Sequence, residues 1–155
     1  MHKVRRARRE DREQLAAMRV LLWPDGSFDE HFEELEGALT TGMNGTLPVA
    51  IFVSESADGT LSGFIEVGLR SHADGCESSR PVGFVEGWFV REEHRHRGIG
   101  KELMSAAEEW SRNQRCREMA SDALIDNPKS HSAHEALGFE VVDRCVHFRK
   151  SLERE

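Results

Sequence analysis

The chain has 155 residues, of which 38% are hydrophobic, and a formal net charge of −7 at pH 7. This length suits one core-forming unit, so we expect residues 1–155 to form a single domain. No apolar run approaches the roughly 20 residues of a membrane-spanning helix, and the basic start lacks the apolar segment of a secretory signal. The three cysteines form no C-x-x-C pair, which argues against a disulfide framework and a zinc ribbon. We therefore expect a cytoplasmic protein without a membrane partner.

Charge is distributed unevenly along the chain. The first twelve residues carry six Lys and Arg side chains and two acidic ones, whereas the remainder carries 15 basic and 26 acidic side chains. An acidic body disfavours nucleic acid, because the phosphate backbone needs a basic face, and it favours cationic partners. We interpret the N-terminal arginines as the solvent side of a first strand rather than as a nucleic-acid arm.

The first half of the chain predicts two helices followed by strands. Residues 3–8 are expected to form a strand and residues 11–22 a helix that stops before Pro24. Ser27 and Glu30 make a capping-box pattern for a second helix to about residue 40, with Gly42 after it. Residues 48–55 and 61–70 predict a hairpin closed by a turn at Asp58-Gly59. A further strand is expected at 82–90.

The second half predicts alternating helices and strands. Helical spacing of apolar residues begins at Gly98 and runs to about residue 113, and a short strand follows at 116–122. Pro128 suits the first turn of a last helix to residue 137, with Gly138 after it. Two final strands are expected at 139–142 and 145–150. The order indicates an α+β, or mixed α/β, domain.

The segment from Trp88 to Leu103 predicts an anion-binding turn. A strand ends, a basic turn with Gly98 and Gly100 follows, and a helix starts at once. The first free N–H groups of that helix and its dipole favour a negative ligand such as a phosphate or pyrophosphate. Leu103 stands where the Rossmann pattern needs its third glycine, and the spacing also excludes a P-loop. The alternative is an ordinary strand-to-helix turn with solvated arginines.

At these residues the sequence resembles the GNAT N-acetyltransferases. Arg95-x-x-Gly98-x-Gly100 is similar to their acyl-CoA pyrophosphate loop, and the element order matches their fold. Further segments resemble the bacterial aminoglycoside 6′-N-acetyltransferases: Leu22-Trp23-Pro24, Asp74-Gly75-Cys76, Phe84-Val85-Glu86-Gly87, the run CREMASD at 116–122, and His134 to Phe139. The resemblance implies a twisted, mostly antiparallel sheet flanked by about four helices.

The resemblance also implies acetyl-CoA as co-substrate. In the family the thioester lies along a splayed strand, here at 86–90, and the pyrophosphate lies in the glycine loop. The residues implied to bind acetyl-CoA are Trp88, Phe89, Val90, Arg95, His96, Arg97, Gly98, Ile99, Gly100, Lys101 and Asn127.

For the acceptor, the resemblance implies a carboxylate-lined pocket. Glu86 and Asp122 match its carboxylates, Asp143 falls near a third position, and the flat face of Trp23 suits a sugar ring or an amine. His72 falls where relatives often carry Tyr. An acidic run, Asp25 to Glu36, is either a cation-attracting rim or a solvated helix face.

The resemblance implies direct transfer in a ternary complex, without a covalent acyl-enzyme. Glu86 or Asp122 either removes the ammonium proton or only anchors the substrate, and the sequence leaves both roles open. The chain has no Tyr to protonate the CoA thiolate. His134 occupies that position, either as the acid or as a residue that only contacts the cofactor.

Other reactive residues give no competing site. The eight histidines lack H-E-x-x-H spacing, and the cysteines show no Cys-His pairing, so we expect no metal and no thiol nucleophile. The resemblance implies an aminoglycoside 6′-N-acetyltransferase that confers antibiotic resistance and, as in relatives, a homodimer. The alternatives are acetylation of a polyamine or a peptide, and a non-catalytic acyl-CoA sensor.

Overall fold

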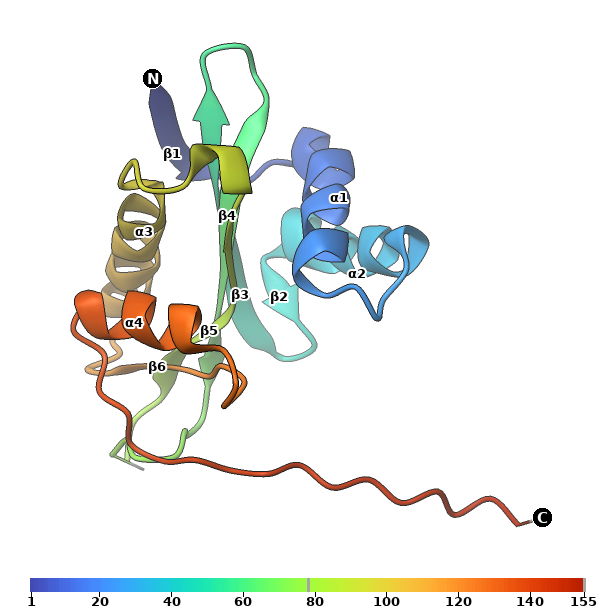
Figure 1. Cartoon of the computed structure of the whole chain (residues 1–155), viewed down its shortest axis with the longest axis vertical. Coiled ribbons are helices and arrows are strands. Elements are labelled where there is room, and N and C mark those ends of the chain that lie inside the picture. The colour runs from blue at the N-terminus through green and yellow to red at the C-terminus, as the bar shows by residue number, and fades with distance from the viewer. Residues whose placement is uncertain (78, 155) are drawn as a thin grey trace. The chain divides into compact units, whose positions relative to one another are not determined.

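The computed structural model describes residues 1–77 and 79–154 and divides the chain into two compact units, Met1–Asp122 and Ala123–Glu155. In the first unit, helices α1 (Arg12–Leu22) and α2 (Phe28–Thr41) cover one face of a central sheet, and α3 (Ile99–Asn113) covers the other (Figure 1). The second unit contains α4 (Pro128–Ala136). No helix within the described ranges combines the length and the apolar character that crossing a membrane requires.

The described part of the sheet has six strands: β1 (His2–Arg6), β2 (Met43–Asn44), β3 (Leu47–Ser56), β4 (Leu61–Arg70), β5 (Val82–Val90) and β6 (Met119–Ser121). Their order is β1-β3-β4-β5-β6, with β2 paired to the other end of β3. All pairs are antiparallel except β5 with β6, which is parallel. This arrangement confirms the predicted mixed α/β fold.

Local capping and turn chemistry set the element boundaries as predicted. The Ser27 hydroxyl accepts a hydrogen bond from the Glu30 N–H at 3.1 Å and so caps α2. Gly42 ends that helix with a φ of 68°, which is the left-handed conformation that glycine adopts at least cost. In the second unit, the Asn127 side chain caps α4 and Pro128 occupies its first turn.

Two apolar layers hold the first unit together. On the α1 and α2 face, Leu15, Met18, Leu35 and Phe64 are completely buried in one cluster. On the opposite face, α3 buries its apolar stripe, including Leu103, Met104 and Ala107, against β4 and β5. Close-packed burial of this kind fixes β4 and β5 between the two helical layers.

The predicted strands at 139–142 and 145–150 are wrong for this structure. No described residue after β6 belongs to a strand, and Val141, Val142, Val146 and Phe148 are exposed. A strand exists only where a second strand completes its hydrogen-bond ladder, and the second unit offers none. The strand predicted at 116–122 covers only Met119–Ser121, and the first strand, predicted at 3–8, covers His2–Arg6.

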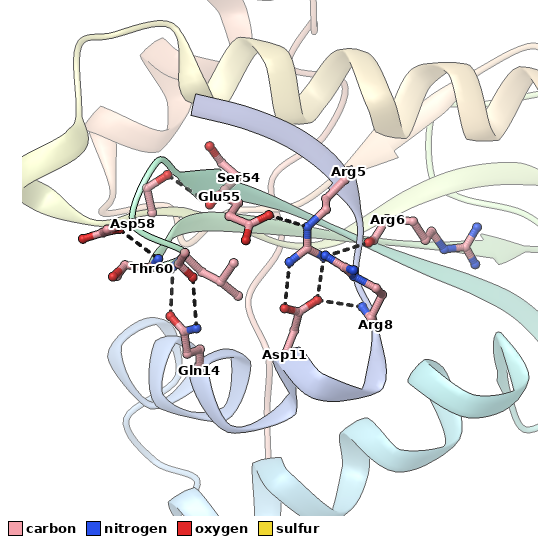
Figure 2. A network of polar contacts seen from close by, with 12 residues as sticks. Arg5, Arg6, Arg8, Asp11, Gln14, Ser54, Glu55, Asp58 and Thr60 are labelled. Atoms are coloured by element: carbon pink, nitrogen blue, oxygen red, sulfur yellow. Dashed lines mark hydrogen bonds and ion pairs between the residues drawn. The ribbon is translucent and has the colours of Figure 1, made fainter. Parts of the chain in front are cut away.

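The N-terminal arginines are not simply the solvent side of a strand. Arg5 donates to both carboxylate oxygens of Asp11, at 2.8 and 2.9 Å, and to Glu55 at 2.8 Å (Figure 2). Only 15% of its side chain is exposed. The network joins β1 to β3 and to the short 3-10 turn Arg9–Asp11 before α1. Arg12 likewise pairs with Glu36 and lies over the Phe32 ring, so it joins α1 to α2.

Candidate active site

A β-bulge in β5 lies at the centre of the candidate site. Glu66 of β4 pairs with Gly87, and the next residue, Val67, pairs with Val85. Glu86 therefore has no partner in the register and is the extra residue of the bulge. Bulges re-aim side chains and are common beside active sites. The Glu86 side chain is 37% exposed.

The pairing between β5 and β6 ends next to the Glu86 bulge. Their parallel ladder covers only Gly83–Val85 and Met119–Ser121. Glu86 and Asp122 are each the next residue after the last pair, Val85 with Ser121, and both are exposed. Two carboxylates thus mark the place where the strands separate, which is a suitable place to receive a protonated amine.

Arg70, which we did not predict, engages Glu86. It donates to the two Glu86 oxygens at 3.0 and 2.9 Å, and its guanidinium lies 3.6 Å from the centre of the Phe84 ring. Both side chains are substantially exposed, so solvent screens the pair and a cationic ligand can exchange with Arg70 at modest cost. Nothing in the local sequence indicated this pair, because its members belong to neighbouring strands.

Trp23 lies directly against the bulge. It follows the last residue of α1, and its ring approaches the backbone of Gly87 so closely that a Cβ there would lie 2.6 Å from the Trp23 Cη2 atom. The ring also meets Phe64 edge to face, at a centroid distance of 6.4 Å. This places the predicted aromatic platform one residue away from Glu86.

Three further residues near Trp23 were not singled out in the sequence analysis: Arg19, His31 and Glu66. Arg19 of α1 forms a buried ion pair with Glu66 of β4, and His31 of α2 contacts the Trp23 backbone and ring. Burial raises the pKa of Glu66, and the charge of Arg19 opposes that shift. Because Arg19 and Glu66 are 47 residues apart in the chain, no local sequence pattern could predict their ion pair.

The predicted anion-binding turn is formed at the start of α3. Gly98 precedes the helix with a φ of 82°, and His96 has a φ of 65°, which is uncommon for a residue with a side chain. Gly100 lets the Trp88 indole lie against the first helical turn, where its N–H donates to the Gly100 carbonyl at 3.1 Å. Trp88 therefore braces the turn with its side chain.

The charges of the turn suit a polyphosphate. Arg97, His96 and Lys101 are exposed around the α3 N-terminus, where the helix dipole favours an anion. The Arg95 Nε atom donates to the Val90 carbonyl at 2.9 Å, which ties the turn to the end of β5. The residues present thus fit the pyrophosphate of acetyl-CoA beside a strand that separates from its neighbour.

The remaining predicted residues fall into two groups. His72 is exposed in the connection between β4 and β5, next to the Ser71 hydroxyl. Asn127, His134 and Asp143 belong to the second unit, where Asn127 caps α4 and Asp143 is exposed. The His134 Nδ1 atom lies 2.7 Å from the Ser130 carbonyl, so it is the protonated nitrogen, and the ring meets Phe139 edge to face. Their roles at the site stay predictions.

The described residues correct one expectation about thiols: the Cys145 Sγ atom lies 3.6 Å from the His147 Nε2 atom, although no Cys-His pairing was expected. The described residues contain no group of three or more His, Cys, Asp or Glu side chains placed to hold a metal ion. Burial raises the pKa of the Cys76 and Cys116 thiols, and the charge of Glu118 raises that of Cys76 further. Both shifts disfavour the reactive thiolate at neutral pH.

Comparison with known proteins identifies the family of the chain. The family model described as acetyltransferase (GNAT) family matches residues 10–139. The chain is 41% identical over 151 residues to an aminoglycoside N(6′)-acetyltransferase type 1 of Stenotrophomonas maltophilia, covering 97% of this chain and 94% of that one. It is 40% identical over 136 residues to the enzyme of that name in Klebsiella aerogenes, covering 88% of each.

Solved structures give the same result. AAC(6′)-Iy, in complex with a bisubstrate analogue of CoA and acetylneamine, has a TM-score of 0.86 at 36% identity, covering 97% of this chain and 99% of that one. AAC(6′)-Ih from Acinetobacter baumannii has a TM-score of 0.86 at 31% identity, covering 99% and 100%. The chain therefore belongs to the GNAT acetyltransferase family, within the group of the aminoglycoside 6′-N-acetyltransferases.

Proposed function

We propose that this protein transfers the acetyl group of acetyl-CoA to the 6′-amino group of aminoglycoside antibiotics and so confers resistance to them. The observation that carries the proposal is the juxtaposition at the β5 bulge: Glu86, Asp122 and Trp23 lie where β5 and β6 separate. Relatives of about 40% identity that bear this activity in their names support the choice of acceptor. The acidic body suits a polycationic substrate.

In this proposal one set of residues binds acetyl-CoA and another binds the aminoglycoside. Gly98 to Lys101, with Arg95, His96 and Arg97, hold the pyrophosphate at the α3 N-terminus, and the backbone of Trp88, Phe89 and Val90 holds the pantetheine arm and thioester. Backbone N–H groups aimed at the thioester oxygen stabilise the negative charge that develops there. Asn127 of the second unit contributes to the pantetheine contact.

On the acceptor side, Trp23, His72 and Asp143 contact the aminoglycoside, and Glu86 and Asp122 bind its ammonium groups. One of these carboxylates accepts a proton from the 6′-ammonium group, directly or through water. The free amine then forms the new C–N bond at the thioester carbon and loses its second proton to water, and the C–S bond breaks to release the CoA thiolate. His134 returns a proton to that sulfur in the same proposal.

The test measures thiol release from acetyl-CoA with kanamycin or tobramycin, beside a polyamine, a peptide and an aminoglycoside with a 6′-hydroxyl group. Turnover on the 6′-amines and none on the 6′-hydroxyl compound supports both the substrate class and the position. Turnover only on polyamine or peptide keeps the acetyltransferase and overturns the resistance role. CoA binding without turnover on any amine identifies a sensor.

We also propose that both units act as one acetyltransferase domain, since the family model runs from residue 10 to residue 139 across the boundary between them.

Exposed apolar residues after α4, including Val146 and Phe148, suit a homodimer in which the second copy covers this segment. Sedimentation of the full chain measures its mass, and a monomer at micromolar concentration overturns the dimer. The proposed site of action is the cytoplasm, where acetyl-CoA is made.

A further inference from the structure

The orientation of the Trp23 ring is not fixed by regular secondary structure, because Trp23 follows the last residue of α1 and belongs to no helix or strand. The Trp23 backbone N–H donates to the Arg19 carbonyl at 2.6 Å, and the Trp23 φ and ψ of −126° and 76° are not helical. Pro24 and Gly26 follow it in the connection to α2. The ring nevertheless lies flush with Gly87 of β5. Its orientation must therefore come from tertiary contacts.

A buried ion pair supplies one of these contacts. The Arg19 guanidinium binds Glu66 Oε1 through Nε, at 2.8 Å, and through Nη2, and it reaches the exposed Glu34 carboxylate at 3.1 Å through Nη1. The two buried side chains are 9% and 10% exposed. The guanidinium carbon also lies 5.5 Å from the centre of the Trp23 ring. Because Glu66 pairs in register with Gly87, the ion pair lies beside the strand position that the ring covers.

His31 supplies the second contact. Its Nε2 atom lies 3.2 Å from the Trp23 carbonyl, and its ring is 6.1 Å from the Trp23 ring at an interplanar angle of 31°. The side chain is buried, and a Cβ on Gly26 would lie 2.8 Å from Nε2, so the connection wraps tightly around the imidazole. Because a carbonyl can only accept, Nε2 is the protonated nitrogen.

We propose that Arg19, Glu66 and His31 are positioning residues that fix the Trp23 indole over Gly87, so that the acceptor ring presents its amine to the neighbouring Glu86. The proposal rests on the proposed function for the identity of the acceptor. A buried ion pair is a poor source of stability, because desolvation offsets its Coulomb attraction. A role in orientation accounts for an ion pair whose guanidinium lies close to the ring.

The first test replaces the pair with apolar side chains, Arg19→Met with Glu66→Met, which leaves no unpaired buried charge. We expect KM for the aminoglycoside to rise roughly tenfold, as on loss of an aromatic anchor, while KM for acetyl-CoA changes by less than about twofold. The control is Arg12→Met with Glu36→Met, which removes an ion pair between α1 and α2 at a distance from Trp23 and should leave both constants unchanged.

The second test uses His31 and does not depend on the ion pair. His31→Gln keeps an N–H donor near the position of Nε2, whereas His31→Leu removes it. We expect the Leu variant to raise KM for the aminoglycoside and the Gln variant to restore most of the loss. Equal effects of the two substitutions would overturn the role of His31.

A spectroscopic measurement separates positioning from activity. With fluorotryptophan in the full chain, the fluorine NMR signal of Trp23 is assigned by Trp23→Phe. Gly87→Ala gives the reference signal of a displaced ring, because its new methyl group would clash with Trp23. Gly68→Ala is the control for this variant, because its new methyl group would meet nothing closer than 3.4 Å. We expect the Trp23 signal to move or broaden in Arg19→Met with Glu66→Met and in His31→Leu. An unchanged signal and an unchanged aminoglycoside KM in these folded variants would overturn the proposal.

The two proposals fail in different ways. If the unaltered chain acetylates no aminoglycoside, the proposed function is overturned, and the Trp23 signal still decides whether these residues hold the ring. If the chain is active and the ion-pair variant behaves like its control, only the positioning role is lost. Should the ion-pair variant not fold, the His31 and Gly87 variants decide the outcome alone.

Discussion

At the residue scale, the two carboxylates of the site differ in their surroundings. Glu86 is held by Arg70, whereas Asp122 is an exposed residue directly after β6. An incoming ammonium group must exchange with Arg70 at Glu86. In the proposed reaction, Arg70 keeps Glu86 in one orientation before the substrate arrives, and this preorganisation favours proton transfer.

Separate substitutions distinguish a base from an anchor. We expect Glu86→Gln to lower kcat by about 100-fold at pH 7, the typical contribution of a general base, and to remove the acidic limb of the kcat profile. Asp122→Asn should mainly raise KM for the aminoglycoside and keep that limb. Steady-state rates between pH 5 and pH 9 provide the measurement, and the reverse pattern would make Asp122 the base.

Asp11 is a residue whose contribution lies in stability. Burial disfavours its charge, but the hydrogen bonds from Arg5 and from the Arg8 N–H outweigh this and lower the pKa of Asp11. The charged carboxylate therefore stabilises the fold above about pH 3.9, its ordinary value, and this contribution is lost as pH falls through the lowered folded-state pKa.

We expect Asp11→Asn to reduce the free energy of unfolding by about 2 kcal/mol at pH 7, in line with hydrogen bonds between charged groups. The difference from the unaltered chain should shrink below about pH 4. Urea denaturation at the two pH values measures it. Glu10→Gln, an exposed acid of the same turn, is the control. An equal loss at both pH values would contradict the assigned role of the Asp11 charge.

At the scale of elements, the turn before α3 depends on backbone conformation. Gly98 has a φ of 82°, and a Cβ there would meet nothing within 4 Å. Substitution by Ala therefore strains the backbone without a steric clash. Since the N–H groups that follow Gly98 form the anion site, we expect a local loss of cofactor binding.

Gly98→Ala should raise KM for acetyl-CoA about tenfold, equivalent to about 1.4 kcal/mol, and leave KM for the aminoglycoside nearly unchanged. Gly45→Ala is a matched control, because Gly45 has a φ of 64° and equally open surroundings outside the site. It should lower stability by a similar amount without changing either KM. Calorimetric titration of CoA checks the result, and equal affinities in the two variants would argue against the anion site.

At the scale of the whole molecule, the acidic body should attract its polycationic substrate over long distances. The formal net charge is −7, and residues 13 onward carry all of the acidic excess, because the first twelve residues are net positive. Salt screens such attraction, with a Debye length of about 8 Å at physiological ionic strength.

We expect kcat/KM for the aminoglycoside to fall about tenfold between 0.02 M and 0.5 M salt, with most of the change in KM. An acceptor amine of lower charge should show a weaker dependence in the same assay. A salt dependence that is equal for the two acceptors would show that the acidic body does not steer the substrate.

Features that depend on neighbouring residues were predictable from the amino-acid sequence. The boundaries of α2, the hairpin turn at Asp58-Gly59 and the turn before α3 follow from capping, glycine conformation and apolar spacing within a few residues. The motif at 95–100 and the segments around Trp23, Glu86 and Asp122 were sufficient to indicate the family.

How these residues meet depends on packing between distant segments of the chain. The Glu86 bulge arises from the register between β4 and β5, and the contact of Trp23 with Gly87 and the Arg19–Glu66 pair each span more than 40 residues. The strands expected after Gly138 are absent among the described residues because alternating apolar residues form a strand only beside a partner. Local patterns specify conformation, whereas partner choice depends on packing between distant segments, which no short stretch of sequence encodes.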